Sequence, residues 1–232
     1  MRRPSTSPPA LGRPLFLLNL KVYPECLGAA SERIALDLEA AGRDAGVPVA
    51  IAPATPDLGR VSAAVGIPVL AQHTDRVSAG AHTGFVPAES VRASGARGSL
   101  VNHSEHPLTA LQVRETVGRL VAADLVAVLC APTVAAARRL ATPEAPYLAV
   151  EPPELIGGDR AVSTARPAVI SDTVSAVRSV APSVSVLCGA GIHDRRDVRR
   201  AIELGAVGVL VASAVTRAPS PRAAIVELLA GF

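Results

Sequence analysis

Short apolar runs alternate with longer amphipathic segments along almost the whole chain, and this alternation restricts the folds that the chain can adopt. Strands are expected over residues 15–18, 47–52, 67–71, 99–101, 125–129, 147–150, 184–187 and 207–211. Because these runs are apolar rather than alternating, they predict strands buried on both faces of a parallel sheet. Eight such units predict an α/β fold, a closed (β/α)₈ barrel, with a doubly wound open sheet as the alternative.

The segments between the runs place apolar residues at helical spacing. Helices are expected over residues 31–45, 108–122, 166–180, 194–204 and 219–230. Glycine and proline mark the junctions, as in the sequences that begin at Gly46 and Gly66. Nothing in the composition indicates a second domain, so we expect one barrel over residues 15–232.

The first 14 residues differ in character from the rest of the chain. They contain Arg2, Arg3 and four prolines, and they lack the apolar stretch of a secretory signal. We therefore expect residues 1–14 to form a disordered tail. No run of about 18 apolar residues follows, so the sequence predicts no transmembrane helix and no membrane partner.

The composition narrows the possible partners and cellular locations. Hydrophobic residues make up 49% of the chain but aromatic residues only 2%, and the net charge is +3. The basic residues are scattered and not interleaved with aromatic residues, so we expect no nucleic-acid surface. Cys26, Cys130 and Cys188 show neither zinc-ligand spacing nor the even count of a disulfide framework, which favours reduced thiols in the cytoplasm.

Polar residues follow the predicted strands at their carboxyl ends, which is where the active site of a parallel α/β fold lies. Asn19 and Lys21 come after the first run, and Lys21 is the only lysine in the chain. All the other lysine-or-arginine positions hold arginine, so Lys21 is the only side chain with a compact ammonium group. A lysine point charge and a planar arginine fork are not interchangeable close to a single oxygen. Lys21 is therefore a candidate functional residue.

Two further strand ends carry groups suited to proton transfer. Glu151 directly follows the sixth run, where its carboxylate is expected at the rim of the barrel as a general base. The prolines and glycines after it, up to Gly158, are typical of a rigid lid with hinges. His103 begins the loop after the fourth run, where backbone amides can keep its ring neutral. Glu105 beside it supplies a carboxylate that could pair with Lys21.

Glycine-rich and small residues follow the last two predicted strands. Gly189, Ala190 and Gly191 lead into the helix expected near Asp194, and Ala212 and Ser213 follow the eighth run. Free backbone N–H groups and the positive end of a helix dipole bind anions, and barrels commonly hold phosphate at these two loops. A small phosphorylated substrate is the expected ligand.

These residues lie within motifs that together resemble the triosephosphate isomerase family, in particular its short archaeal-type branch. The resemblance extends from Leu15 to the C-terminus. The motifs that carry it are Asn19 to Tyr23, Ala71 to His73, Gly80 to Gly84, Asn102 to Glu105, Glu151 to Gly157, Cys188 to Ile192 and Ala201 to Gly205. The resemblance implies a TIM barrel that interconverts dihydroxyacetone phosphate and D-glyceraldehyde 3-phosphate without a cofactor or metal.

The resemblance also implies a role for each candidate. Glu151 would remove a proton from the carbon beside the carbonyl, and His103 would polarise that carbonyl as a neutral electrophile. Lys21 would stabilise the enediolate and the phosphate, Asn19 would help to place the substrate, and Glu105 would hold the lysine. A homodimer or homotetramer is implied as well, with the segment around His82 to Gly84 near a subunit contact.

The chain departs from the family pattern at three places. The family's lid has Ile-Gly-Thr-Gly, whereas this chain has Ile156-Gly157-Gly158-Asp159-Arg160. Ala214 follows Ser213 where the family has glycine, and His106-Pro107 stands where the family commonly has an arginine. These changes leave two alternatives open. One is a related isomerase of a tetrulose phosphate such as erythrulose phosphate, and the other is a barrel that binds phosphorylated metabolites without turnover.

Overall fold

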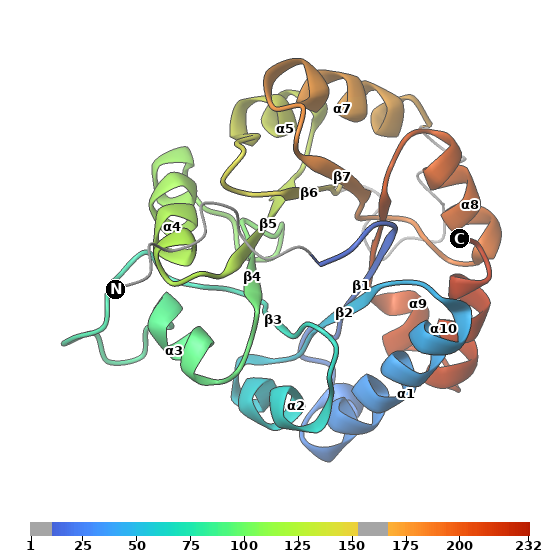
Figure 1. Ribbon diagram of the computed structural model, residues 1–232, viewed down its shortest axis with the longest axis horizontal. Coiled ribbons are helices and arrows are strands. Elements are labelled where there is room, and N and C mark those ends of the chain that lie inside the picture. Colours follow the sequence, from blue (N-terminus) through green and yellow to red (C-terminus); the bar gives the residue numbers. More distant parts are fainter. Residues whose placement is uncertain (1–10, 153–166) are drawn as a thin grey trace.

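The computed structural model describes residues 11–152 and 167–232, and it shows eight parallel strands arranged as a barrel (Figure 1). The strands are β1 (Leu15–Asn19), β2 (Val49–Ala52), β3 (Leu70–Ala71), β4 (Gly98–Val101), β5 (Val126–Ala131), β6 (Tyr147–Val150), β7 (Ser185–Cys188) and β8 (Gly208–Val211). Neighbours pair in the order β2-β1-β8-β7-β6-β5-β4-β3, and a parallel bridge between Ile51 and Val69 joins the two ends. The predicted closed barrel is confirmed, and the open sheet is not formed.

Helices surround the barrel in Figure 1. They are α1 (Ala29–Ala45), α2 (Leu58–Ala64), α3 (Ala88–Ala93), α4 (Ala110–Ala122), α5 (Val134–Leu140), α7 (Pro167–Val180), α8 (Arg195–Glu203), α9 (Ser213–Thr216) and α10 (Pro221–Leu229), with short 3₁₀ turns η1 (Pro24–Cys26) and η2 (Thr55–Asp57). All five predicted helices are present. Arg166, the first residue of the helix predicted over residues 166–180, lies outside the described residues. The sequence did not reveal α2, α3, α5 and α9, because four to seven residues are too few to establish a helical period.

The core has two layers, one inside the barrel and one between the barrel and its helices. Along β1, Leu15 and Leu17 belong to the inner layer, whereas Phe16 and Leu18 belong to the outer layer. Each of these four side chains is fully buried. A strand with both faces buried needs apolar residues at every position, which is why the runs in the sequence show no alternation.

The chain is ordered earlier than the sequence predicts. Leu11 is buried in the inner layer of the core, and its backbone N–H donates a hydrogen bond of 3.0 Å to the Tyr147 hydroxyl. That hydroxyl donates in turn to the carbonyl of Gly12, at 3.1 Å. The expectation of a disordered tail is therefore wrong for residues 11–14, while residues 1–10 lie outside the described part of the chain.

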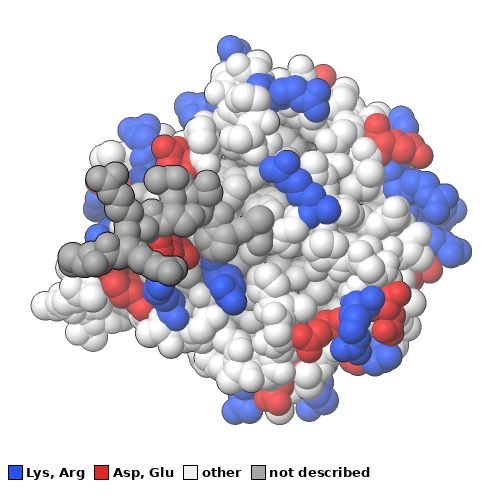
Figure 2. Space-filling view, viewed as in Figure 1, with Lys and Arg blue, Asp and Glu red and all other residues white. Residues whose placement is uncertain are grey.

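The surface carries charges of both signs. On the face shown in Figure 2, basic and acidic side chains lie intermixed around the circumference. Several of them pair across elements, as in Arg222 of α10 with Asp37 of α1, at 2.9 Å. Among the described residues, no helix is both long and apolar enough to cross a membrane.

Candidate active site

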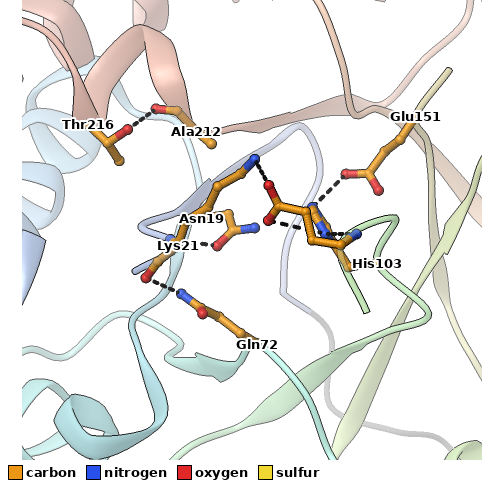
Figure 3. A network of polar contacts seen from close by, with 8 residues as sticks. Asn19, Lys21, Gln72, His103, Glu151, Ala212 and Thr216 are labelled. Atoms are coloured by element: carbon orange, nitrogen blue, oxygen red, sulfur yellow. Dashed lines mark hydrogen bonds and ion pairs between the residues drawn. The ribbon is translucent and has the colours of Figure 1, made fainter. Parts of the chain in front are cut away.

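Side chains from β1, β4 and β6 meet at the carboxyl end of the barrel, as Figure 3 shows. Asn19 and Lys21 come from the end of β1, His103 from the turn after β4, and Glu151 from the residue after β6. A cavity is lined by these four residues and by residues 189–193 and 210–213. The structure thus brings together the candidates that the sequence placed at separate strand ends. Gly158, Asp159 and Arg160 lie outside the described residues.

Lys21 has a backbone conformation that is unusual for a residue with a side chain. Its φ angle is +51°, and such left-handed backbone is uncommon outside glycine. The side chain of Asn19 accepts a hydrogen bond from the Lys21 N–H at 2.9 Å. Gln72 Nε2 donates to the carbonyls of Lys21 (2.9 Å) and Ala52 (3.0 Å). These bonds hold the strained backbone and fix the direction of the side chain.

The Lys21 side chain points across the barrel to Glu105. Its Nζ lies 2.7 Å from Glu105 Oε1, and the lysine side chain is only 13% exposed while that of the glutamate is 57% exposed. The pair therefore presents an oriented, largely desolvated ammonium group to the cavity. The role of Gln72 was not identified from the sequence, because nothing local links it to a carbonyl 51 positions earlier.

His103 is held in one tautomer by the backbone. The Glu105 N–H donates to His103 Nδ1 at 3.1 Å, so the ring proton lies on Nε2. Burial lowers the pKa of His103; the Glu105 carboxylate raises it and the Lys21 ammonium lowers it. Both observations favour a neutral imidazole with an Nε2–H donor. That atom lies 3.5 Å from Oε1 of Glu151, on the cavity side.

Asn102 anchors the turn that carries His103. Its φ angle is +66°, and its side chain donates to the carbonyl of Cys130 at 2.9 Å and accepts from the N–H of Leu108 at 2.8 Å. The asparagine thus ties the end of β4 to β5 and to the start of α4. Asparagine tolerates left-handed backbone better than most residues, which is the only local signal of this role in the sequence.

Glu151 is a buried carboxyl group, with only 2% of the residue exposed. Burial raises its pKa to about 8 from an ordinary 4.5, and it outweighs the opposing effects of the Cys130 thiol and the Lys21 charge. Its Oε2 atom has no hydrogen-bond partner among the described residues. A carboxyl group whose pKa is shifted toward neutrality and whose oxygen is free matches what a general base at neutral pH requires.

Gly189 makes room for this carboxylate. A Cβ atom at that position would lie 2.5 Å from Cγ of Glu151, so any larger residue would force the Glu151 side chain to move. Gly191 has a φ angle of +61°, which also favours glycine. The sequence assigned these glycines to anion binding alone, and the structure adds the packing requirement at Gly189.

The amides at the glycine-rich loop differ in availability. The Gly189 N–H is bonded to the carbonyl of Val150, whereas the N–H groups of Ala190 and Gly191 have no partner within residues 11–152 and 167–232. Ser213 lies at the start of α9, after Ala212, whose carbonyl accepts from the Thr216 hydroxyl (Figure 3). Amides without a partner among the described residues therefore lie in the loop after β7, which lines the cavity together with Ala212 and Ser213.

The start of α8 differs from the sequence-based expectation of free N–H groups. The Asp194 side chain accepts from the amides of Arg196 and Asp197, and the Asp197 side chain accepts from those of His193 and Asp194. These carboxylates already cap the helix, so its dipole is not available to a second anion. The loop amides of residues 190–191 are the better donors.

Together, a buried carboxyl group, a neutral histidine and an oriented lysine in one cavity define a barrel enzyme that moves protons next to a carbonyl, an isomerase of the aldose-ketose type. The profile of the family described as triosephosphate isomerase matches residues 14–229. The chain belongs to the triosephosphate isomerase family, and it is an isomerase of phosphorylated trioses.

Curated relatives support this assignment, and a solved structure supports the fold. The triosephosphate isomerase of Methanothermus fervidus is 42% identical over 219 residues, which cover 94% of this chain and 99% of the relative. That of Methanothermobacter thermautotrophicus is 44% identical over 216 residues, covering 93% and 94%. The crystal structure of triosephosphate isomerase from Bartonella henselae superimposes with a TM-score of 0.73 at 18% identity, covering 94% of this chain and 97% of the other, and supports the barrel fold.

Proposed function

We propose that the chain interconverts dihydroxyacetone phosphate and D-glyceraldehyde 3-phosphate through an enediolate, with Glu151 as the base. Ionised Glu151 takes a proton from the hydroxyl-bearing carbon beside the carbonyl and returns it to the former carbonyl carbon. Nε2 of His103 gives its proton to the carbonyl oxygen and regains one from the hydroxyl oxygen, so that no proton is gained or lost overall. The His103 Nε2–H donates to the carbonyl oxygen as negative charge develops there. The Lys21 ammonium stabilises that charge, and Glu105 and Asn19 keep the lysine in place.

The observation that carries this proposal is the meeting of two proton-handling atoms. Oε1 of Glu151 and Nε2 of His103 lie 3.5 Å apart beside one cavity, although they come from different strands. A carbonyl carbon and its neighbour are about one bond length apart, so one base and one donor at this spacing can serve both carbons. Lys21 adds a positive charge at the same cavity.

The phosphate end of the substrate is assigned to the loops after β7 and β8. The supporting features are the amides of Ala190 and Gly191, which have no partner among the described residues, together with Ser213, which lines the same cavity. Gly189 and Ala212 also line the cavity, and we include them in the proposed phosphate site. Gly158 lies outside the described residues, so only the family resemblance supports including it in the proposed phosphate site.

A coupled assay with each triose phosphate tests the proposed reaction. Wild-type protein should isomerise both substrates, whereas Glu151→Gln should lower kcat by several orders of magnitude with little change in KM. Turnover of erythrulose phosphate in place of the trioses would support the tetrulose alternative. Binding of inorganic phosphate without any turnover would support the non-catalytic alternative.

We also propose a homodimer or homotetramer and a cytoplasmic location. A second hollow adjoins the site at Lys21 and His103, and its lining includes Thr83, Gly84 and Phe85. Phe85 is 52% exposed, which favours cover by another subunit. The buried, unpaired cysteines support a reducing compartment. Light scattering after gel filtration distinguishes a monomer from the two oligomers.

A further inference from the structure

Cys188 is a buried thiol at the end of β7, directly before the glycine-rich loop, and the proposed reaction does not use it. The residue is fully buried. Its Sγ–H donates a hydrogen bond of 3.6 Å to the carbonyl oxygen of Ala190, two positions later. A thiol is a weak donor, but this one contacts the backbone of the loop that lines the active-site cavity. The side chain of Cys188 therefore holds the loop from the core.

The bond to the Ala190 carbonyl sets the direction of the following amide. The carbonyl of Ala190 and the N–H of Gly191 belong to the same peptide unit, and in a trans peptide these two groups point in opposite directions. The Gly191 N–H is therefore directed away from the buried thiol. Gly191 lines the cavity, and its N–H has no partner within residues 11–152 and 167–232.

We propose that Cys188 is a positioning residue for substrate binding, whose thiol holds the Ala190 carbonyl so that the Gly191 N–H points at the phosphate group of the substrate. This inference rests on the proposed phosphate site and deepens it by naming the side chain that orients one of its amides. The peptide unit between Ala190 and Gly191 can rotate through the glycine backbone at little cost. An amide that is already oriented binds an anion without the free-energy cost of ordering the loop.

The thiol of Cys188 keeps the proton that it donates. Burial raises the pKa of Cys188 to about 12 and outweighs the opposing effect of the hydrogen bond to Ala190. The carboxylates of Asp197 and Glu151 raise the same pKa further. Since the pKa of Glu151 is about 8, the thiol is a donor whether that carboxyl group is ionised or not.

Calorimetric titration with inorganic phosphate tests the inference independently of turnover. Cys188→Ala removes the donor, and Cys188→Ser keeps a donor in a side chain of the same shape. Cys26→Ala is the matched control, because Cys26 is also fully buried and its Sγ–H donates to the carbonyl of Thr216 at 3.9 Å. Cys188→Ala should bind phosphate about three- to tenfold more weakly than wild type, and the other two variants should stay within about twofold.

Steady-state kinetics with the triose phosphates gives a second measurement. A residue that orients a phosphate-binding amide affects substrate binding and not proton transfer, so Cys188→Ala should raise KM by about the same factor and leave kcat within about threefold. A lower kcat with an unchanged KM would contradict the proposed role. Urea unfolding of each variant confirms that it is folded.

Equal dissociation constants for wild type and Cys188→Ala would overturn the inference. So would an equal loss in Cys188→Ser, because the hydrogen bond would then not matter, or in Cys26→Ala, because any buried thiol would then have the same effect. If wild-type protein binds phosphate but isomerises no triose phosphate, the proposed reaction fails while the role of Cys188 is still decided by the titrations. If wild-type protein binds no phosphate, the proposed phosphate site and the role of Cys188 both fail.

Discussion

Replacing Glu151 by glutamine should stabilise the protein at neutral and alkaline pH, although it removes the proposed catalytic base. The wild-type carboxyl group is buried, and burial raises its pKa to about 8 in the folded state. In the unfolded chain the same group titrates near its ordinary value. Glutamine has the same shape and is uncharged at every pH, so it lacks the cost of a buried negative charge.

The size of the effect follows from the two pKa values. Below pH 4.5 the carboxyl group is protonated in both states, and the two proteins should be similar in stability. Between pH 4.5 and 8 only the unfolded state releases its proton, so wild type loses about 1.4 kcal/mol per pH unit relative to the variant. Above pH 8 the difference levels off at an upper limit of about 5 kcal/mol.

Urea unfolding at pH 5, 7 and 9 measures this difference. Both proteins are compared at the same concentration, because subunit association would otherwise contribute to the free energy of unfolding. Glu25→Gln is the matched control, since it makes the same chemical change at an exposed position. The advantage of Glu151→Gln over wild type should grow from pH 5 to pH 9, and that of the control should not.

Two results would refute the reasoning. If the difference between Glu151→Gln and wild type were independent of pH, the carboxyl group would not have a raised pKa in the folded protein. If the difference grew toward acid pH, the carboxylate would be stabilised by the fold rather than destabilised, and Lys21 would outweigh burial.

Three further substitutions test other parts of the site and the fold. Gly189→Ala should lower kcat by about 100-fold in steady-state kinetics, because the new Cβ displaces Glu151 by roughly 1 Å; an unchanged kcat would contradict the packing argument. Lys21→Arg should remove most activity, because a planar fork cannot replace the point charge, and a kcat/KM near wild type would show that the ammonium is dispensable. Tyr147→Phe should reduce the free energy of unfolding by about 1–2 kcal/mol through loss of the hydroxyl contacts to the segment at Leu11; equal stability in urea would mean that this segment contributes little.

Much of the fold could be predicted because the strands are buried on both faces. A run such as residues 15–18 is apolar at every position, and this pattern is visible without knowledge of its neighbours. The start of the ordered chain could not be predicted in the same way. Leu11 is one apolar residue in a proline-rich stretch, and its burial depends on Tyr147, 136 positions later.

Some residues of the candidate site could likewise be predicted from the sequence, and others could not. Lys21, His103 and Glu151 were found because each follows a strand, and strand ends meet in a barrel. Gln72 and Asn102 were not recognised as supporting residues, because they act through carbonyl groups that come close only in the folded chain. Their contribution is visible in distances and backbone angles, not in residue type.

The sequence by itself determined the order of strands and helices and the chemical groups available at the barrel mouth, since periodicity and residue type are local properties. The tertiary structure alone decided the protonation and the orientation of those groups. The raised pKa of Glu151, the lowered pKa of His103 and the hydrogen bond from Gln72 that holds Lys21 each depend on burial or on atoms from distant segments. Desolvation and hydrogen bonding arise only when the chain has closed around them.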